Sequence, residues 1–172
     1  MTDASVEEIA VKLLAGCGYT VSTAESCTGG LVAGCIMNVP GASDVYNAGF
    51  ITYSNEAKIK YLGVKRETLD KYGAVSEQTA REMAAGTAAA AEADVGLSTT
   101  GIAGPGGGTD EKPVGLVYIG CSVRGNVTVR KCMFSGTRQQ IRNSAVTAVL
   151  ELLIESLHDP DKTDQRTVVQ CK

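Results

Sequence analysis

The sequence predicts one α/β domain in which a mixed β-sheet lies between layers of helices. Three observations support this fold class. The chain has 172 residues, 44% of them hydrophobic, which is enough for one domain with a substantial core. Segments with apolar residues at helical spacing alternate with short β-branched segments, a pattern typical of strands joined by helices. Two strand-like segments late in the chain are separated only by "RGN", which predicts an antiparallel hairpin.

In the first third of the chain, two helices and two strands are predicted to alternate. Apolar residues at helical spacing predict a helix over residues 5–16, with Ser and Asp before it as candidate caps. The β-branched run 19–24 predicts a strand. The apolar run 29–39 predicts a buried helix, ended by the Pro-Gly pair that follows, and residues 45–54 predict a second strand.

The middle of the chain predicts two further helices and a third strand. The run "NEAKIKYLG" predicts a short helix that ends at Gly63. Residues 76–93 predict a longer helix with Ser76 at its N-terminal cap. Residues 94–101 predict a strand that continues into the glycine-rich loop 101–115.

The last part of the chain predicts the hairpin and a final helix. The hairpin strands are expected at residues 114–123 and 127–135, and the helix at 137–157. We therefore expect one domain of residues 1–157. The polar segment 158–172 shows no hydrophobic period and is predicted to be a flexible tail.

Charge and composition argue against several classes of function. The net charge of −3 does not suit a general nucleic-acid-binding surface, which needs clustered Lys and Arg. The opening "MTDASVEEIA" is polar and acidic, unlike an export signal, and no apolar run reaches the roughly 20 residues of a membrane helix. We therefore expect a cytoplasmic protein that contacts no membrane, with its six scattered cysteines reduced.

The histidine content limits the chemistry further. The single histidine, His158, stands in the polar tail, so neither a histidine-based triad nor a histidine-rich metal site is expected. Acid–base chemistry in this chain must then use Lys, Tyr, Glu or Asp side chains.

The stretch "AESCTGG" is placed where a strand meets a helix, so it presents free backbone N–H groups at a positive helix end. Gly29 and Gly30 would let a ligand approach the backbone closely, and an oxyanion or phosphate would be stabilised there. Alternatively, the glycines only allow a sharp turn and Thr28 only caps the helix. For a nucleophile we favour Ser26 over Cys27, because a catalytic cysteine usually needs a histidine whereas a serine can be activated by lysine.

Candidate partners for that serine occur in "TYSNEAK", which contains Tyr53 and Lys58. A lysine base near neutral pH needs its pKa lowered by roughly three units, about 4 kcal/mol, which burial and a nearby positive dipole can supply. Alternatively, Tyr53 simply packs on its strand and Lys58 is a solvated helix residue.

Two further segments could contact an anionic substrate. The loop "GIAGPGGGTDEKPVG" lacks the features of a P-loop or a dinucleotide fingerprint, and it could form the rim of a site or a flexible surface loop. In "SGTRQQIR", Arg138 and Arg142 stand one helical turn apart, a spacing that suits phosphate recognition but is also common on solvated helix surfaces.

Taken together, five motifs in order, "TAESCTGG", "GFITYSNEAK", "GAVSE", "GIAGPGGG…EKPVG" and "FSGTRQQIR", closely resemble the CinA C-terminal-domain family over roughly residues 5–156. The resemblance implies a three-layer α/β/α sandwich with a mixed sheet. That family includes stand-alone nicotinamide-nucleotide amidohydrolases. The resemblance therefore implies hydrolysis of nicotinamide mononucleotide (NMN) to nicotinic acid mononucleotide and ammonia, within pyridine nucleotide (NAD) metabolism and without a metal or organic cofactor.

The resemblance also assigns roles to residues. The family's serine falls on Ser26, its tyrosine on Tyr53 and its lysine on Lys58. Its substrate-binding arginine falls in "TRQQIR", where we favour Arg142 over Arg138.

A mechanism that fits these roles is acyl transfer by Ser26, with Lys58 as the base, acting directly or through Tyr53. Backbone amides of residues 27–30 (Cys27, Thr28, Gly29 and Gly30) would hold the oxyanion, and Arg142 would hold the 5′-phosphate with help from the glycine-rich loop at Gly104. Two alternatives stay open: a non-catalytic nucleotide-binding or interaction domain of the competence/damage-inducible type, and an amidase that uses Cys27. The oligomeric state is also left open.

Overall fold

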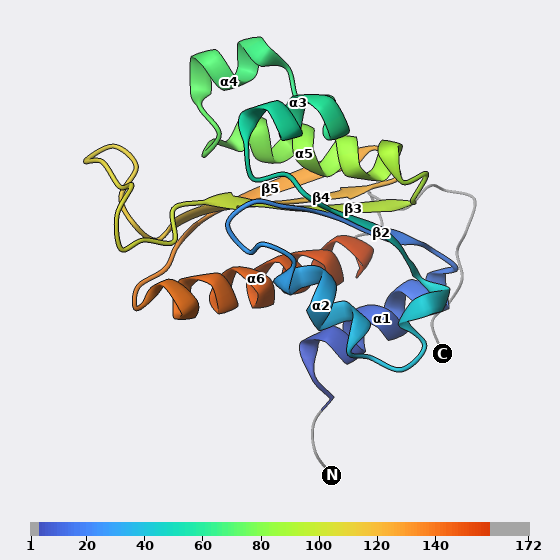
Figure 1. Cartoon of the computed structure of the whole chain (residues 1–172). Coiled ribbons are helices and arrows are strands. Elements are labelled where there is room, and N and C mark those ends of the chain that lie inside the picture. Colours follow the sequence, from blue (N-terminus) through green and yellow to red (C-terminus); the bar gives the residue numbers. More distant parts are fainter. Residues whose placement is uncertain (1–3, 159–172) are drawn as a thin grey trace.

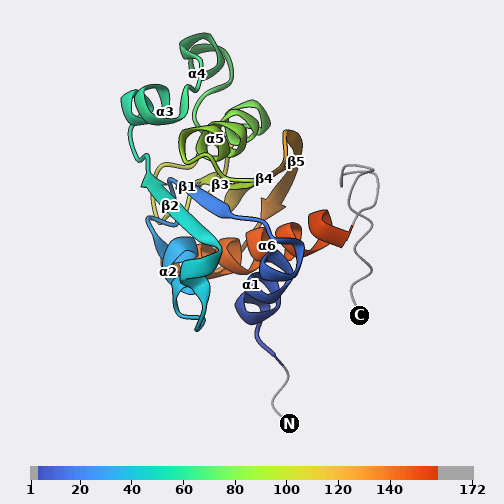
Figure 2. The ribbon, with the colours of Figure 1, turned by 90° about the vertical axis from the view of Figure 1, so that its right-hand side faces the viewer.

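The computed structural model describes residues 4–158, which form one five-stranded sheet between two layers of helices (Figures 1 and 2). Helices α1, α2 and α6 cover one face of the sheet, and α3, α4 and α5 cover the other (Figure 1). The elements in chain order are α1 (Val6–Cys17), β1 (Val21–Glu25), α2 (Leu31–Met37), η1 (Ala42–Asp44), β2 (Tyr46–Ile51), α3 (Asn55–Leu62), α4 (Arg66–Tyr72), α5 (Glu77–Ala90), β3 (Val95–Gly101), β4 (Leu116–Val123), β5 (Asn126–Met133) and α6 (Arg138–His158).

The sheet has the strand order β2-β1-β3-β4-β5 and is mixed. Strand β1 runs parallel to both β2 and β3, whereas β3, β4 and β5 pair antiparallel. The β4–β5 hairpin closes with Arg124 and Gly125, both at positive φ, as a two-residue hairpin turn requires. The three-layer α/β/α sandwich with a mixed sheet is therefore confirmed.

The chain leaves β1 toward one edge of the sheet and later returns to continue on the other side of β1, so the carboxyl end of β1 is a topological switch point. From β1 the chain passes through α2 on one face to β2 at the edge. From β2 it passes through α3, α4 and α5 on the opposite face to β3, on the other side of β1. In open α/β sheets such a switch point leaves a crevice at the carboxyl ends of the strands, where ligands bind.

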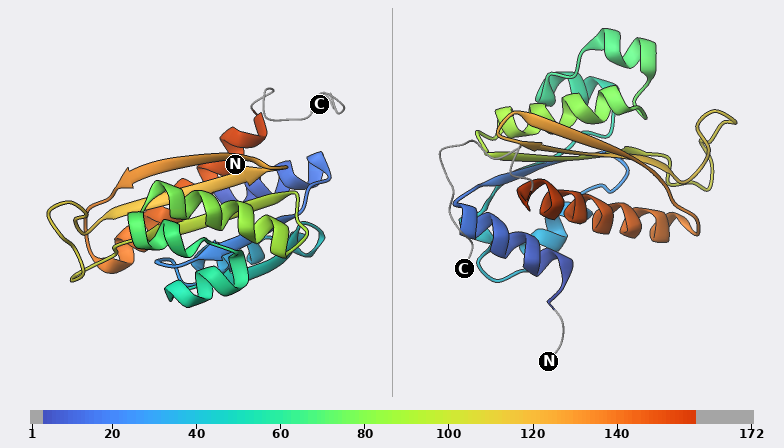
Figure 3. Two further views of the ribbon diagram at one scale, coloured as in Figure 1. Left: turned by 90° about the horizontal axis from the view of Figure 1, so that it is seen from above. Right: turned by 180° about the vertical axis from the view of Figure 1, so that it is seen from behind.

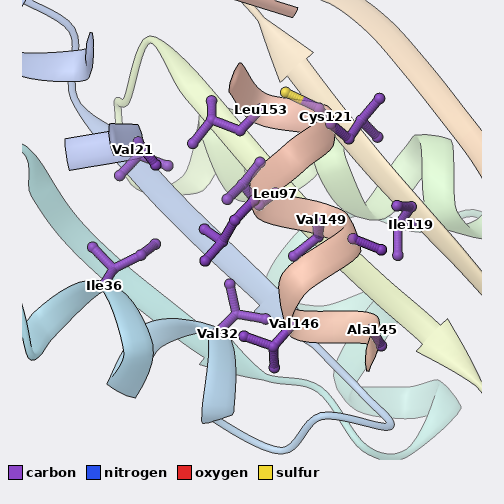
Figure 4. Close-up of a cluster of buried hydrophobic side chains, with 14 of the residues drawn as sticks. Val21, Val32, Ile36, Leu97, Ile119, Cys121, Ala145, Val146, Val149 and Leu153 are labelled. Carbon is purple, nitrogen blue, oxygen red and sulfur yellow. The ribbon is translucent and has the colours of Figure 1, made fainter. Parts of the chain in front are cut away.

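The main hydrophobic core lies between the sheet and the α1, α2 and α6 layer. Strand residues such as Val21, Leu97 and Ile119 pack there against Val149 and Leu153 of α6, and all are buried (Figure 4). A smaller cluster on the opposite face gathers around Met83 of α5. The glycine-rich loop after β3 projects beyond the end of the sheet (Figure 3).

Two elements differ from the prediction. Strand β2 ends at Ile51 rather than at residue 54, because Ser54 caps α3 with its hydroxyl on the amide of Ala57. Helix α4 was not predicted, since its sequence is mostly polar. It is anchored by Glu82 of α5, whose carboxylate accepts from the Lys65 amide and the Thr68 hydroxyl.

The N-cap of α5 at Ser76 and the end of α3 at Gly63 are confirmed. The predicted tail, residues 158–172, lies outside the described residues except for His158, which ends α6. Among the helices of residues 4–158, none combines the length and the apolar character needed to cross a bilayer.

Candidate active site

The turn between β1 and α2, residues 26–30, is shaped by its glycines. Gly29 has φ +60° and Gly30 has φ +98°, a backbone region that L side chains rarely adopt. Ser26 begins this β1–α2 turn, and its amide donates to Thr99 O of β3 at 3.0 Å. The turn therefore sits at the switch point, between the carboxyl ends of β1 and β3.

Glu25 holds the far end of this turn. Its side chain is 1% exposed, and its carboxylate accepts from the amides of Gly30 (2.9 Å), Val32 (3.1 Å) and Ala33 (2.8 Å). It also accepts from the Thr28 hydroxyl at 2.6 Å. The carboxylate thus occupies the N-terminus of α2, where the helix dipole favours negative charge.

Sequence reasoning missed Glu25, although one signal was available: an acidic residue ends an otherwise uncharged strand just before a helix start. The contact changes the prediction for the oxyanion donors. The Gly30 amide is already used, whereas the amides of Thr28 and Gly29 have no hydrogen-bond acceptor among residues 4–158.

Ser26 and Lys58 meet at the start of the β1–α2 turn. The Nζ atom of Lys58, on α3, lies 3.2 Å from Ser26 Oγ. The same nitrogen lies 2.7 Å from Thr52 O and 3.2 Å from Tyr53 O. Lys58 is 1% exposed, so the alternative of a solvated helix lysine is wrong.

The surroundings of Lys58 make its proton easier to remove than that of a free lysine. Burial lowers its pKa from 10.5 to about 8, against a smaller opposing effect of nearby negative groups such as Glu56. No carboxylate forms an ion pair with it within the described part of the chain. As an ammonium, Lys58 donates to all three oxygens; as a neutral amine it can keep two N–H bonds to the carbonyls and turn its lone pair toward the Ser26 hydroxyl. The site can therefore hold the lysine as a base.

Tyr53 contributes its backbone rather than its phenol to this cluster. Its carbonyl accepts from Lys58, while its side chain is 69% exposed. The structure thus brings the Ser26 and Lys58 side chains together and leaves the Tyr53 side chain exposed.

Cys27 faces the main core instead of the solvent. It is buried, and that burial raises the pKa of its thiol to about 11. Because the thiolate is the nucleophilic form, a thiol that stays protonated at neutral pH is poorly suited to attack an amide.

The two candidate arginines, both on α6, bond to backbone carbonyls. Arg142 donates from Nε to Cys27 O at 3.0 Å and from Nη2 to Thr28 O at 2.8 Å. Arg138 donates from Nη1 to Gly104 O at 2.8 Å. Arg142 therefore ties α6 to the β1–α2 turn, and Arg138 ties it to the glycine-rich loop.

A groove of about 440 Å³ lies between α2 and α6 and adjoins the β1–α2 turn at Gly30. Its lining is uncharged and consists of Gly30, Leu31, Gly34, Cys35, Asn38, Asn143, Val146 and Thr147. Among residues 4–158, no three His, Cys, Asp or Glu side chains gather in an arrangement that could hold a metal ion.

Comparison with known proteins gives one consistent family. A family model described as the CinA C-terminal domain matches residues 3–157. A CinA-like protein of Kosmotoga olearia is 60% identical over 153 residues, which cover 89% of this chain and 37% of that protein. The chain thus spans little more than a third of the length of that curated relative.

Solved structures agree with the family model. The competence/damage inducible protein CihA from Agrobacterium tumefaciens is 44% identical with a TM-score of 0.86, covering 92% of this chain and 99% of that one. A CinA superfamily protein from Escherichia coli is 34% identical with a TM-score of 0.83, covering 90% and 92%. The chain therefore belongs to the CinA C-terminal domain family.

Proposed function

We propose that this protein is an amidase that hydrolyses the carboxamide of NMN to nicotinic acid mononucleotide and ammonia. The observation that carries the proposal is the contact between Ser26 Oγ and the buried amine of Lys58, whose pKa of about 8 leaves a usable fraction of free base near neutral pH. Family membership and the motifs shared with nicotinamide-nucleotide amidohydrolases support NMN as the substrate.

The reaction follows from this pair as acyl transfer. Neutral Lys58 takes the proton of the Ser26 hydroxyl while Oγ attacks the carboxamide carbon. The oxyanion that forms is held by the free amides of the β1–α2 turn. The Lys58 ammonium then protonates the departing nitrogen, which leaves as ammonia. Water, activated by the same amine, hydrolyses the ester on Ser26 and restores the serine.

We propose the direct route from Ser26 to Lys58 rather than a relay through Tyr53. The nitrogen and oxygen atoms are already 3.2 Å apart, so the proton needs no intermediate carrier. The Tyr53 ring, which is exposed, is then not needed for proton transfer.

For the 5′-phosphate we propose Arg138. It uses Nη1 on Gly104 O, while its Nε and Nη2 atoms have no acceptor among the residues described. It lies four residues, about 6 Å along the helix axis, from Arg142, which contacts the β1–α2 turn. The phosphate would then bind beside the glycine-rich loop, at a distance from the reacting carboxamide.

The test is ammonia release from NMN by the wild type, Ser26→Ala and Lys58→Met. Loss of the base should reduce kcat by about 10²–10⁴-fold, and loss of the nucleophile at least as much. Lys60→Met is the matched control, because Lys60 is an exposed lysine on the same helix. Undiminished turnover in either site variant removes that residue from the mechanism.

The same experiment distinguishes the amidase from a second candidate function, a nucleotide-binding domain that does not catalyse a reaction. The Agrobacterium relative is known as a competence/damage inducible protein, a name that does not refer to hydrolysis. A nucleotide-binding domain of that kind would show a rise in melting temperature with NMN but no ammonia from the wild type, and this result would overturn the amidase proposal.

A further inference from the structure

We infer that Arg142 is a positioning residue: by holding the carbonyls of Cys27 and Thr28, it directs the amides of Thr28 and Gly29 toward the oxyanion that forms on Ser26. The inference rests on the proposed amidase reaction. It gives Arg142 a role in setting the geometry of the β1–α2 turn and not in binding the phosphate.

The peptide bonds of the β1–α2 turn fix the directions of its amides. In a trans peptide the C=O and the N–H of the next residue point in opposite directions. The Cys27 carbonyl belongs to the peptide that carries the Thr28 amide, and the Thr28 carbonyl to the one that carries the Gly29 amide. Since both carbonyls accept from Arg142, both amides point away from it.

The helices that carry Arg142 and Lys58 lie on opposite faces of the sheet. Arg142 lies on α6, on one face of the sheet, whereas α3 lies on the opposite face (Figure 1). Lys58 reaches Ser26 Oγ from α3. Amides turned away from α6 are therefore turned toward the face where the nucleophile and its base meet, which is where the oxyanion develops.

Glu25 holds the other half of the same segment. Its carboxylate binds the amides of Gly30, Val32 and Ala33, while Arg142 binds the carbonyls before them. Within residues 4–158 the two side chains do not pair with each other. Each charge instead fixes backbone groups, so the amides of Thr28 and Gly29 are left for an anion.

The guanidinium group of Arg142 suits this double contact. The guanidinium presents Nε and Nη2 as two parallel donors in a fixed plane, which lets one side chain bind two successive carbonyls. Its third nitrogen, Nη1, lies 3.4 Å from Gln139 Oε1. A lysine keeps the charge but has one donor nitrogen in place of the planar Nε and Nη2 pair, so Arg142→Lys changes the geometry of the contact while keeping the charge.

The test compares kcat and KM for NMN and for nicotinamide riboside, which lacks the phosphate. For Arg142→Lys we expect kcat to fall about 10²-fold on both substrates, as for the loss of one oxyanion donor, with KM changed less than about threefold. A loss confined to NMN and expressed mainly in KM would show that Arg142 binds the phosphate and would overturn the inference.

The matched control is Arg81→Lys. Arg81, on α5, also donates to a backbone carbonyl, Val127 O at 2.7 Å, and to a neighbouring side chain, Glu77. We expect this variant to keep wild-type kcat on both substrates. An equal fall in kcat in both variants would mean that Arg142 acts only through general stability, against the inference.

A second measurement does not depend on catalysis. Amide hydrogen exchange by NMR should become faster at Gly30, Val32 and Ala33 in Arg142→Lys and remain unchanged there in Arg81→Lys. If the wild type releases no ammonia from either substrate, the proposed function fails, and this exchange pattern alone decides whether Arg142 holds the turn. Unchanged exchange in Arg142→Lys would overturn the inference.

Discussion

The amine of Lys58 lies 3.2 Å from the hydroxyl of Ser26, although 32 positions separate them in the chain. Parallel pairing of β1 and β2 brings them together. Glu25 and Ile51, the last residues of the two strands, are in register, and the Thr52 amide donates to Glu25 O at 2.9 Å. Both segments leave the sheet after these residues. Helix α3 starts at Asn55, so its first turn brings Lys58 into contact with Ser26.

This contact predicts a single ionisation on the acid side of the pH–rate profile. Only neutral Lys58 can accept the Ser26 proton, and its pKa is about 8. Activity should therefore fall about tenfold for each pH unit below that value and level off above it. The measurement is kcat/KM for NMN from pH 6 to pH 9.5. A profile that is flat across pH 7–8.5 would exclude Lys58 as the base.

The lowered pKa of Lys58 also predicts how stability depends on pH. The unfolded chain still binds the proton at pH values where the folded state has lost it, so this group makes the folded state relatively more stable as pH rises from about 8 toward 10.5. In Lys58→Met that dependence is absent. The free energy of unfolding of the wild type, relative to this variant, should rise by about 1 kcal/mol between pH 7 and pH 9. Urea titrations of both proteins at both pH values measure this difference in unfolding free energy. A decrease in the difference from pH 7 to pH 9 would contradict the prediction.

Most of the fold could be predicted from the sequence because its cues are local. Apolar periodicity predicts α1 and α5, and the "RGN" turn predicts the β4–β5 hairpin. Helix α4 lacks such a cue, since it is held by the carboxylate of Glu82 from another helix. A contact of that kind depends on tertiary packing and leaves no period in the sequence.

The site could be predicted only in part, for the same reason. The residue types of Ser26 and Lys58 suggested a nucleophile and a base, but their distance depends on strand register. The bonds of Arg142 to Cys27 O and Thr28 O link segments more than 110 positions apart. No spacing rule along one chain contains that contact.

Tyr53 provides a test of the direct proton route. Tyr53→Phe removes the phenol but leaves the backbone carbonyl that accepts from Lys58. Because the ring is 69% exposed, we expect kcat to stay within about twofold of the wild type, whereas loss of a relay would cost about 10²-fold or more. Tyr61→Phe, an exposed tyrosine of α3, is the control. A hundredfold fall only in Tyr53→Phe would place the phenol in the proton path.

Cys27 provides a test of the alternative nucleophile. Burial raises its thiol pKa to about 11, so little thiolate exists at neutral pH. Cys27→Ala should keep kcat within about threefold and lose about 1 kcal/mol of unfolding free energy, as is typical of a buried substitution. Ammonia release and urea unfolding measure the two effects. If activity disappears in a folded Cys27→Ala but survives in Ser26→Ala, the thiol is the nucleophile.

Among the residues of the candidate site, we expect replacement of Glu25 to cause the largest loss of unfolding free energy. Its carboxylate accepts from one hydroxyl and three amides in a buried position, and a glutamine amide would place N–H donors against some of those donors. Glu25→Gln should therefore lower the free energy of unfolding by about 2–4 kcal/mol. Glu82→Gln is the matched control, since that carboxylate also accepts from a backbone amide and a threonine hydroxyl but is only half-buried and makes two bonds. Urea denaturation of both variants measures the difference. An equal or smaller loss in Glu25→Gln would show that its carboxylate is not what holds the start of α2, and the turn that carries Ser26 would then need another anchor.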